Sequence, residues 1–554
     1  MGKTLLAIGL DSAEPVVLEK YLAEGAMPNL KRLREQGGFA LLDYSDLFNA
    51  ELPWTTFILG SRPQEVGYWD FFHYHADRYR LETRAAYEYD ERKPFWALGN
   101  DYRVCVVDVP QARVVDDVNG VQLMAWGAHS PQCPTVSAPP DLLDELNRKH
   151  GESPALHNDY GQSLRLQDVE RVRRLLQVNA RRRTAICKDL LEREDWDLFL
   201  TVYSEPHAAG HGSWQVSSPD HPLYDTLHGR VQGDPLRESY EACDRALGEL
   251  LEAAGPDAPV VVFSVHGMGP NTKDLPNGIF LPELLFRWNF PGHKAIRGKQ
   301  GHPLPPLYTE CGSFPLEVWL SKYDANPLRR ELLPKLPWGA YSRVERYLGH
   351  GDLGLGDGSD LISPFELKRE TKVVPWMGSH WYRPLWPKMK AFCVPTFSDG
   401  AVRINVRGRD GEGIVDPQDY HRVCDEVTAV LHTLRDCRRG IPMVKSVLRM
   451  REDPLDDDRT LPSADLIVVW QEEYAADSVE APGYGRIGPV PHYRGGSHLS
   501  QGFAVIRHPQ VAAGSTMARG NVLDLAPTIL SMLGAPTQPH FSGQSLVPGA
   551  VTAS

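Results

Sequence analysis

A buried strand that ends beside two histidines constrains this chain more than any other feature. The run Trp196–Tyr203 is mostly apolar and stops at Ser-Glu-Pro, and His207 and His211 follow. A short apolar run of this kind favours a parallel strand covered on both faces, and open α/β sheets bind ligands beyond the carboxyl ends of such strands. We expect a polar loop here. Residues four apart share one face of a helix, so the two histidines could hold one metal ion, although solvated loop histidines are the alternative.

Three other apolar runs have a similar polar residue at one end. Asp11 directly follows the run 4–10, His266 follows the run 258–264, and His498 shortly precedes the run 502–507. Asp11 could also simply cap the next helix. Carboxylate and imidazole ligands suit Zn, Mn or Fe. Because these residues occupy equivalent positions in one predicted sheet, they predict a present or former metal site made of Asp11, His207, His211, His266 and His498.

Composition excludes several classes of protein. The 554 residues are 42% hydrophobic, which is enough for a large core and predicts two to four units. A net charge of −13 disfavours a broad nucleic-acid surface. No apolar run approaches the ~18 residues of a membrane helix. The eight cysteines are scattered and the first residues lack the pattern of a signal peptide, which predicts a cytoplasmic protein with free thiols. A homo-oligomer stays open.

The order of the patterns predicts an α/β fold with a central, mostly parallel sheet flanked by helices. Residues 1–269 would form the first part of the core, although 117–157 look irregular. A Pro-, Gly- and Trp-rich insertion at 270–385 would cover the site as a lid, since long irregular insertions are usually functional. Residues 386–470 would form a small α+β subdomain, and 471–554 would complete the core with a C-terminal helix.

Seven segments give the chain a family resemblance. They are IGLDSAEP, PWTTFILGSRPQEVGYWDF, YSEPHAAGH, VVVFSVHGMGPN, RINVRGRDGEGIV, GGSHLSQGF and DLAPTILSMLGAP. In this order they resemble the alkaline phosphatase superfamily, in its branch of type I phosphodiesterase/nucleotide pyrophosphatase-like proteins. The resemblance implies a mostly parallel sheet, two adjacent metal ions, and a Thr, Ser or modified Cys nucleophile that attacks phosphate or sulfate.

The chain departs from the family at the metal ligands. The family's loop after the central strand reads Glu-Pro-Asp with a His four residues beyond, and here His207 replaces the Asp while His211 is retained. The family's Ser-Asp-His-Gly has Val265 in place of its Asp. Both changes remove negative charge. We therefore expect one divalent ion, zinc before manganese or iron, held by His207, His211 and His498, with Asp11 and His266 in a secondary or bridging shell.

The nucleophile position also departs from the family. The residue ten before Gly60 is Ala50, and a shift of one residue gives Glu51, so neither carries a hydroxyl or thiol. Thr55 has a hydroxyl but lies inside the following predicted helix, where packing is the plainer role. Asn49 and Ala50 lie at the start of that helix, where an anionic substrate group would be stabilised.

These features predict a metal-dependent hydrolase of a phosphate, phosphodiester, phosphonate or sulfate ester that acts on a small anionic substrate. A metal-bound water would replace the missing nucleophile. Glu51 or Glu205 could act as general base, with Thr55 as a substitute nucleophile; the alternatives are a charge favouring the helix dipole for Glu51 and a structural role for Glu205. Two other functions stay open, namely a non-hydrolytic metal-dependent reaction (lyase, isomerase, transferase or oxygen-using) and a non-catalytic ligand-binding relative.

Two further groups could contact the substrate. Arg403, Arg407 and Arg409 form a basic stretch that could meet an anion, with solvated or structural arginines as the alternative. The aromatic stretch 68–73 could form a pocket wall, and core packing is the equal alternative.

Overall fold

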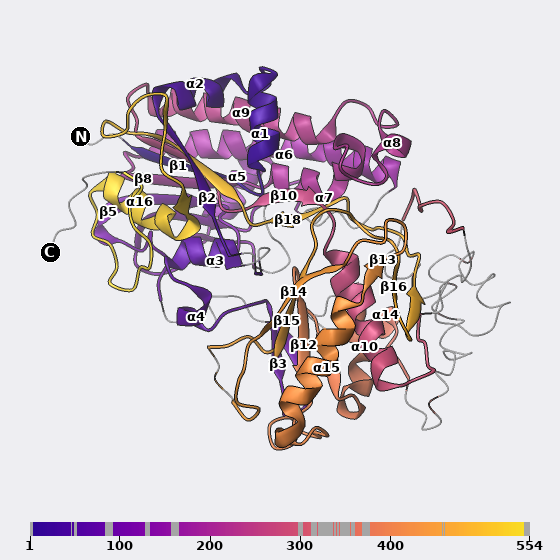
Figure 1. Cartoon of the computed structure of the whole chain (residues 1–554). Coiled ribbons are helices and arrows are strands. Elements are labelled where there is room, and N and C mark those ends of the chain that lie inside the picture. Colours follow the sequence, from indigo (N-terminus) through magenta and orange to yellow (C-terminus); the bar gives the residue numbers. More distant parts are fainter. Residues whose placement is uncertain are drawn as a thin grey trace.

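The computed structural model describes residues 4–547 of the chain. Left out within that span are 46, 49–51, 84–91, 128–132, 157–164, 297–302, most of 312–359, 368–376, 457 and 459. Two lobes are visible in Figure 1, an upper one around a large sheet and a lower one around a smaller sheet.

A ten-stranded sheet forms the core of the upper lobe. From edge to edge it contains Ser515–Thr516 (β20), Gly38–Asp43 (β2), Gly502–Arg507 (β19), Val260–Ser264 (β9), Leu5–Leu10 (β1), Leu198–Tyr203 (β8), Gly99–Val107 (β5), Val118–Met124 (β6) and Val136–Ala138 (β7), with Gly520–Asn521 (β21) also beside β2. The five strands from β9 to β6 are parallel, whereas β19 and β7 run antiparallel to their neighbours. The predicted mostly parallel sheet is confirmed.

Helices cover both faces of this sheet, because apolar side chains of β1 point alternately to one face and to the other. Leu6, Ile8 and Leu10 belong to one buried apolar cluster and Leu5 and Ala7 to another. Successive strand residues point to opposite faces, so each cluster is the core of one face. The first face packs on Pro15–Ala23 (α1), Pro28–Gln36 (α2), Leu166–Arg193 (α6) and Pro235–Ala254 (α9), and the second on Leu52–Leu59 (α3) and Leu525–Leu533 (α16) (Figure 1).

The lower lobe contains a four-stranded antiparallel sheet of Ala391–Val394 (β11), Gly400–Ile404 (β12), Leu466–Trp470 (β15) and Val444–Arg449 (β14). Helices Leu281–Asn289 (α10) and Tyr420–His432 (α15) lie in this lobe (Figure 1). It also holds the hairpin Phe72–His75 (β3) and Arg80–Thr83 (β4), and the small sheet Arg435–Asp436 (β13), Val479–Ala481 (β16) and Gly485–Ile487 (β17). Much of the expected lid at 270–385 lies outside the described residues, and the domain boundaries stay predictions.

Two local expectations were wrong. The segment after β8 is the helix Glu205–Ser217 (α7), not a loop, because Pro206 suits the first helical turn and small residues let the whole helix be buried. The stretch expected to be irregular contains β6, β7 and the helix Leu142–His150 (α5). Gly120 lets β6 pair with β5, since a Cβ there would lie 2.1 Å from the Val104 carbonyl oxygen.

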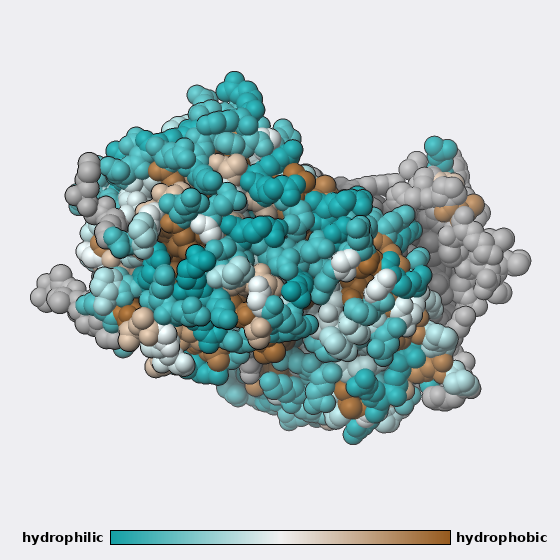
Figure 2. All heavy atoms as spheres, turned by 90° about the horizontal axis from the view of Figure 1, so that it is seen from above, coloured by the Kyte–Doolittle hydropathy of each residue, from teal (hydrophilic) through white to brown (hydrophobic). Residues whose placement is uncertain are grey.

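Among the remaining short elements of the described chain are Pro63–Val66 (α4), Tyr224–Leu227 (α8), Pro364–Leu367 (α14), Gly267–Pro270 (β10) and Gly496–Leu499 (β18). Among the helices of the described residues, none combines the length and the apolar character needed to cross a membrane. On the face shown in Figure 2, hydrophilic side chains cover most of the described surface, and apolar ones appear in small separate groups.

Candidate metal centre

Two histidines of the site come from one face of α7. His207 and His211 lie one turn apart, and their Nε2 atoms are 3.2 Å from each other. Both side chains are buried. Gly210 brings this part of α7 close to β10, since a Cβ there would lie 2.7 Å from the Met268 side chain. The predicted pairing of the two histidines on one helical face is therefore present.

The third histidine comes from β18. His498 lies opposite Met268 in the antiparallel pair β10–β18. Its ring centroid is 5.1 Å from that of His207 and 4.9 Å from that of His211. One ligand atom from each of these three side chains lies within 4.8 Å of the other two. We call His207, His211 and His498 the histidine cluster.

The histidine cluster has the chemistry that a zinc-like ion requires. The Nδ1 of His211 lies 2.8 Å from the Gly496 carbonyl oxygen. Since a carbonyl only accepts, Nδ1 carries the proton and Nε2 keeps its lone pair. Tetrahedral Zn with Zn–N distances of ~2.0–2.1 Å sets two nitrogens ~3.3 Å apart, close to the separation of the His207 and His211 Nε2 atoms. Burial, reinforced by neighbouring imidazoles, holds the pKa of His498 well below its usual range and favours the neutral ligand.

Asp11 and His266 lie on the other side of His498. The Nδ1 atoms of His266 and His498 are 3.2 Å apart, and His266 Nε2 is 3.5 Å from Asp11 Oδ1. Trp54 of α3 donates its indole N–H to the same Asp11 oxygen at 3.0 Å. The structure thus brings all five predicted ligands into one buried neighbourhood, with Asp11 and His266 beside the histidine cluster.

Ser12 contacts both His266 and His498, and the sequence did not predict it as a site residue. Its Oγ lies 3.2 Å from Nδ1 of His266 and 3.4 Å from Nδ1 of His498. Its backbone has φ of +56°, a left-handed conformation that is uncommon for residues other than glycine. A buried hydroxyl held in this way orients both rings. Its only sequence signal is a position directly after the Asp that ends β1.

The Glu205 carboxylate takes part in a buried ion pair. Its carboxylate accepts hydrogen bonds from Arg183 at 2.6 Å and from Asn179 at 2.8 Å. Arg183 also binds Asp108 at 2.8 Å, and both side chains of this second pair are fully buried. These contacts favour the structural role for Glu205 and argue against the predicted general base.

Of the other predicted catalytic and substrate residues, the structure describes only Thr55, which lies within α3. Thr55 donates its hydroxyl to Gln111 at 3.1 Å and is buried, which favours a packed helix residue over a nucleophile. Asn49, Ala50 and Glu51 lie outside the described residues.

Glu14 is a second residue that the sequence did not single out. Burial raises the pKa of its carboxyl from the ordinary 4.5 to about 7, against the effect of backbone hydrogen bonds. One oxygen is 3.4 Å from the Val16 N–H, and the Met268 backbone also opposes the rise in pKa. Gly267 makes room for the Glu14 side chain, because a Cβ there would lie 1.9 Å from Oε2. A buried carboxyl that titrates near neutrality thus stands three residues beyond Asp11.

The fold and the histidine cluster define an α/β protein with a site suited to a divalent ion. The sequence profile of the family described as type I phosphodiesterase / nucleotide pyrophosphatase matches residues 5–296, more than half of the chain. The chain therefore belongs to that family, within the alkaline phosphatase superfamily, as its motifs predicted. No curated protein sequence matches it.

Solved structures give distant likenesses. Phosphonoacetate hydrolase from Sinorhizobium meliloti 1021, in complex with phosphonoformate, is 15% identical with a TM-score of 0.46, and 96% of each chain is covered. An inactive variant of murine ectonucleotide pyrophosphatase/phosphodiesterase 5, in complex with AMP, is 12% identical with a TM-score of 0.45, and 98% of each chain is covered. These likenesses are too remote to indicate what this chain acts on.

Proposed function

We propose that this phosphoester-hydrolase family member cleaves a small anionic phosphate, phosphodiester, phosphonate or sulfate ester with one divalent ion, zinc, in the histidine cluster. The observation that carries the proposal is the meeting of three buried imidazoles, one of which has its tautomer fixed by a backbone carbonyl. Neutral imidazoles are the ligands that suit zinc in a catalytic site with an open position.

A single ion fits the charge of this neighbourhood. His207 and Val265 occupy positions where the family pattern has carboxylates, so Asp11 is the one carboxylate of the predicted ligand set. It already accepts a hydrogen bond from Trp54. Two adjacent divalent ions would leave a large uncompensated positive charge in a buried site, which is costly.

Water is the proposed nucleophile. The histidine cluster would hold the zinc ion, which would supply a nucleophile at neutral pH by lowering the pKa of a water molecule toward ~7. Ala50 offers no reactive group, and the Thr55 hydroxyl is bonded to Gln111. Within the chain, His211 is held in its tautomer by Gly496, and Ser12 orients His266 and His498.

The test is ester hydrolysis by zinc-loaded protein. We expect turnover of at least one among an aryl phosphate monoester, a diester, a phosphonate monoester and a sulfate ester. His211→Ala should abolish it, while His432→Ala, which changes an exposed histidine of α15, should leave it intact. Zinc binding without hydrolysis of any of the four would contradict the proposal and favour a non-hydrolytic reaction. A cytoplasmic location stays a prediction.

A further inference from the structure

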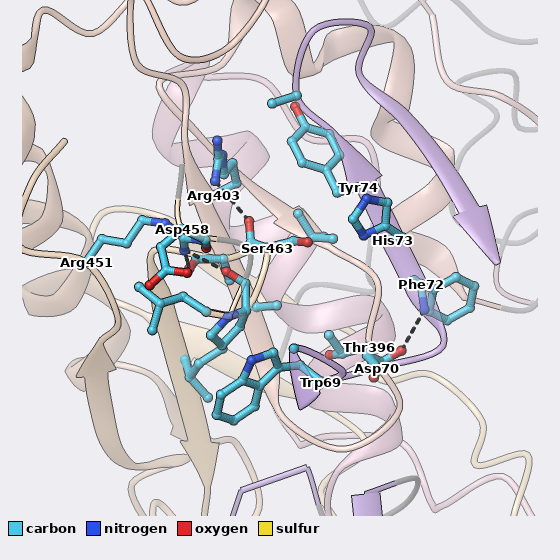
Figure 3. Close-up of a pocket in the computed structure, with 18 of the residues that line it drawn as sticks. Trp69, Asp70, Phe72, His73, Tyr74, Thr396, Arg403, Arg451, Asp458 and Ser463 are labelled. Carbon is cyan, nitrogen blue, oxygen red and sulfur yellow. Dashed lines mark hydrogen bonds between the residues drawn. The ribbon is translucent and has the colours of Figure 1, made fainter. Parts of the chain in front are cut away.

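A second polar site lies in the lower lobe, away from the residues of the histidine cluster. A cavity of about 740 Å³ opens between the β3–β4 hairpin and the sheet that contains β12 and β15. No member of the histidine cluster is among its described lining residues. The volume is within the range of small-molecule sites. Figure 3 shows Arg403, Arg451 and Ser463 facing Tyr74 and His73 across this space.

Three arginines line the cavity, and two of them are paired with buried carboxylates. The Nε of Arg403 donates to Asp410 at 2.9 Å, and Arg409 donates to Asp465 at 2.7 Å. Arg451, the third, is 5% exposed. We call Arg403, Arg409 and Arg451 the arginine cluster. With two aspartates against three guanidinium groups, this part of the wall carries an excess positive charge.

The excess charge falls on Arg451. Its guanidinium donates to the carbonyl oxygens of Pro462 and Ala464, both at 2.6 Å. Its Nε has no partner, and no carboxylate lies within ion-pair distance of it among the described residues. Burial lowers the pKa of Arg451; Asp465 opposes the shift, and the other two members of the arginine cluster reinforce it. A buried cation without a counter-ion is costly, so a bound anion would stabilise it.

Four carboxylates also line the cavity, and none of them forms an ion pair with Arg451 among the described residues, although Asp456 opposes the lowering of the Arg451 pKa. Asp70 accepts from the backbone N–H groups of Phe72 and Phe397. Asp458 accepts from the backbone and hydroxyl of Thr460. Asp456 accepts from the Asp458 N–H, and Asp77 accepts from Arg78.

The opposite wall offers a second unused donor and a flat apolar surface. The Tyr74 hydroxyl is buried and has no hydrogen-bond partner among the described residues. Its ring lies 5.6 Å from the guanidinium carbon of Arg403. Trp69 is fixed by the hydrogen bond from its indole N–H to the Thr460 carbonyl at 2.7 Å. A fixed indole ring is a suitable surface for a planar apolar group.

We propose that this cavity binds a small organic anion, with its charged oxygens against Arg451, Arg403 and the Tyr74 hydroxyl and its planar apolar part against Trp69. The charged end would receive charge-assisted hydrogen bonds, which are the stronger ones. The predicted anion contact of Arg403 and Arg409 and the predicted pocket wall of the aromatic stretch 68–73 would thus belong to one site. Arg407 is not part of the site, since it is exposed and pairs with Asp416.

Phenylphosphonate is the probe, because it carries a dianion on a flat ring and is not an ester. Calorimetric titration of the full chain is done in a His211→Ala background, which removes the proposed metal site as a competing binder. In this background we expect one binding site. Arg451→Gln should weaken it by at least about tenfold and Tyr74→Phe by about threefold, from the loss of hydrogen bonds to a charged group.

Arg449→Gln is the matched control, because Arg449 is a nearby arginine of β14 that pairs with Asp425 at 2.6 Å. It should leave the affinity unchanged. Tyr74→Phe removes a single unpartnered hydroxyl, so it tests the site even if Arg451→Gln folds poorly. Unchanged affinity in Tyr74→Phe, or no binding before either change, would overturn the proposal. Neither result bears on the histidine cluster, whose own test is ester hydrolysis.

Discussion

The molecule contains two buried polar centres of different chemistry. The histidine cluster in the upper lobe presents three imidazoles, whereas the arginine cluster in the lower lobe has three guanidinium groups, two of them paired with carboxylates. Burying polar groups is costly unless they are paired. The first centre gathers nitrogen ligands at one point, and the second includes a cation without an ion-pair partner among the described residues. The difference supports the proposals of a metal ion for one centre and an anion for the other.

A third buried centre, around Arg183, is a fully paired ion-pair network. Arg183 is fully buried, as Arg451 nearly is, but it binds both Asp108 and Glu205. Two carboxylates surround this guanidinium, and none pairs with Arg451 among the described residues. The contrast separates a structural ion-pair network from a site with unused capacity.

Replacing each of these two arginines by methionine should give very different losses of stability. Arg183→Met leaves two buried carboxylates without their cation, so we expect a loss of about 3–5 kcal/mol. Arg451→Met removes a cation that has only carbonyl partners, so its cost should stay below about 2 kcal/mol. Chemical denaturation of both variants measures the two values. Equal losses would break the distinction between the paired and the unpaired centre.

Glu14 should make the upper lobe sensitive to pH. Because its folded pKa of about 7 exceeds the ordinary value of 4.5, its contribution to stability is fully present below 4.5 and is lost as pH rises through 7. The difference in unfolding free energy between the protein and Glu14→Gln should therefore shift by up to about 3 kcal/mol over this window, against the protein at high pH. Denaturation at pH 5 and pH 8 measures it. A difference that does not vary with pH would mean that Glu14 is not desolvated.

Ser12 should give the smallest effect, because it acts through other residues. Ser12→Gly relieves the left-handed backbone and should add about 1 kcal/mol to the stability of the metal-free protein. Losing the hydroxyl beside His266 and His498 should weaken zinc binding by about 10–100-fold. Ser12→Ala is the matched control, since it should lose the zinc affinity without the gain in stability. Unchanged zinc affinity in both variants would remove Ser12 from the site.

The sequence predicted those parts of the molecule that local pattern determines. Apolar runs such as Trp196–Tyr203 located the central strands, and polar residues at their ends located the predicted ligands. Helix α7 was missed because Pro206, Gly210 and Gly212 are typical of loops, whereas tight packing against β10 is a tertiary effect.

The remaining site residues depend on distant contacts. Ser12 and Glu14 have ordinary local surroundings, and their burial is created by β10, β18 and α9. Glu205 was predicted as a general base because its ion-pair partner, Arg183, lies on another helix and cannot be recognised from the local sequence. Likewise, Arg451 stands about fifty residues from Arg403 in the chain, so no local spacing joins them in one cluster.

Metal content per chain tests the central claim most directly. Protein purified without added metal or chelator, and then equilibrated with zinc, should contain about one ion per chain by elemental analysis. His211→Ala and His498→Ala should each lose it, whereas His432→Ala should keep it. About two ions per chain, or one ion that survives both changes, would contradict a single ion in the histidine cluster.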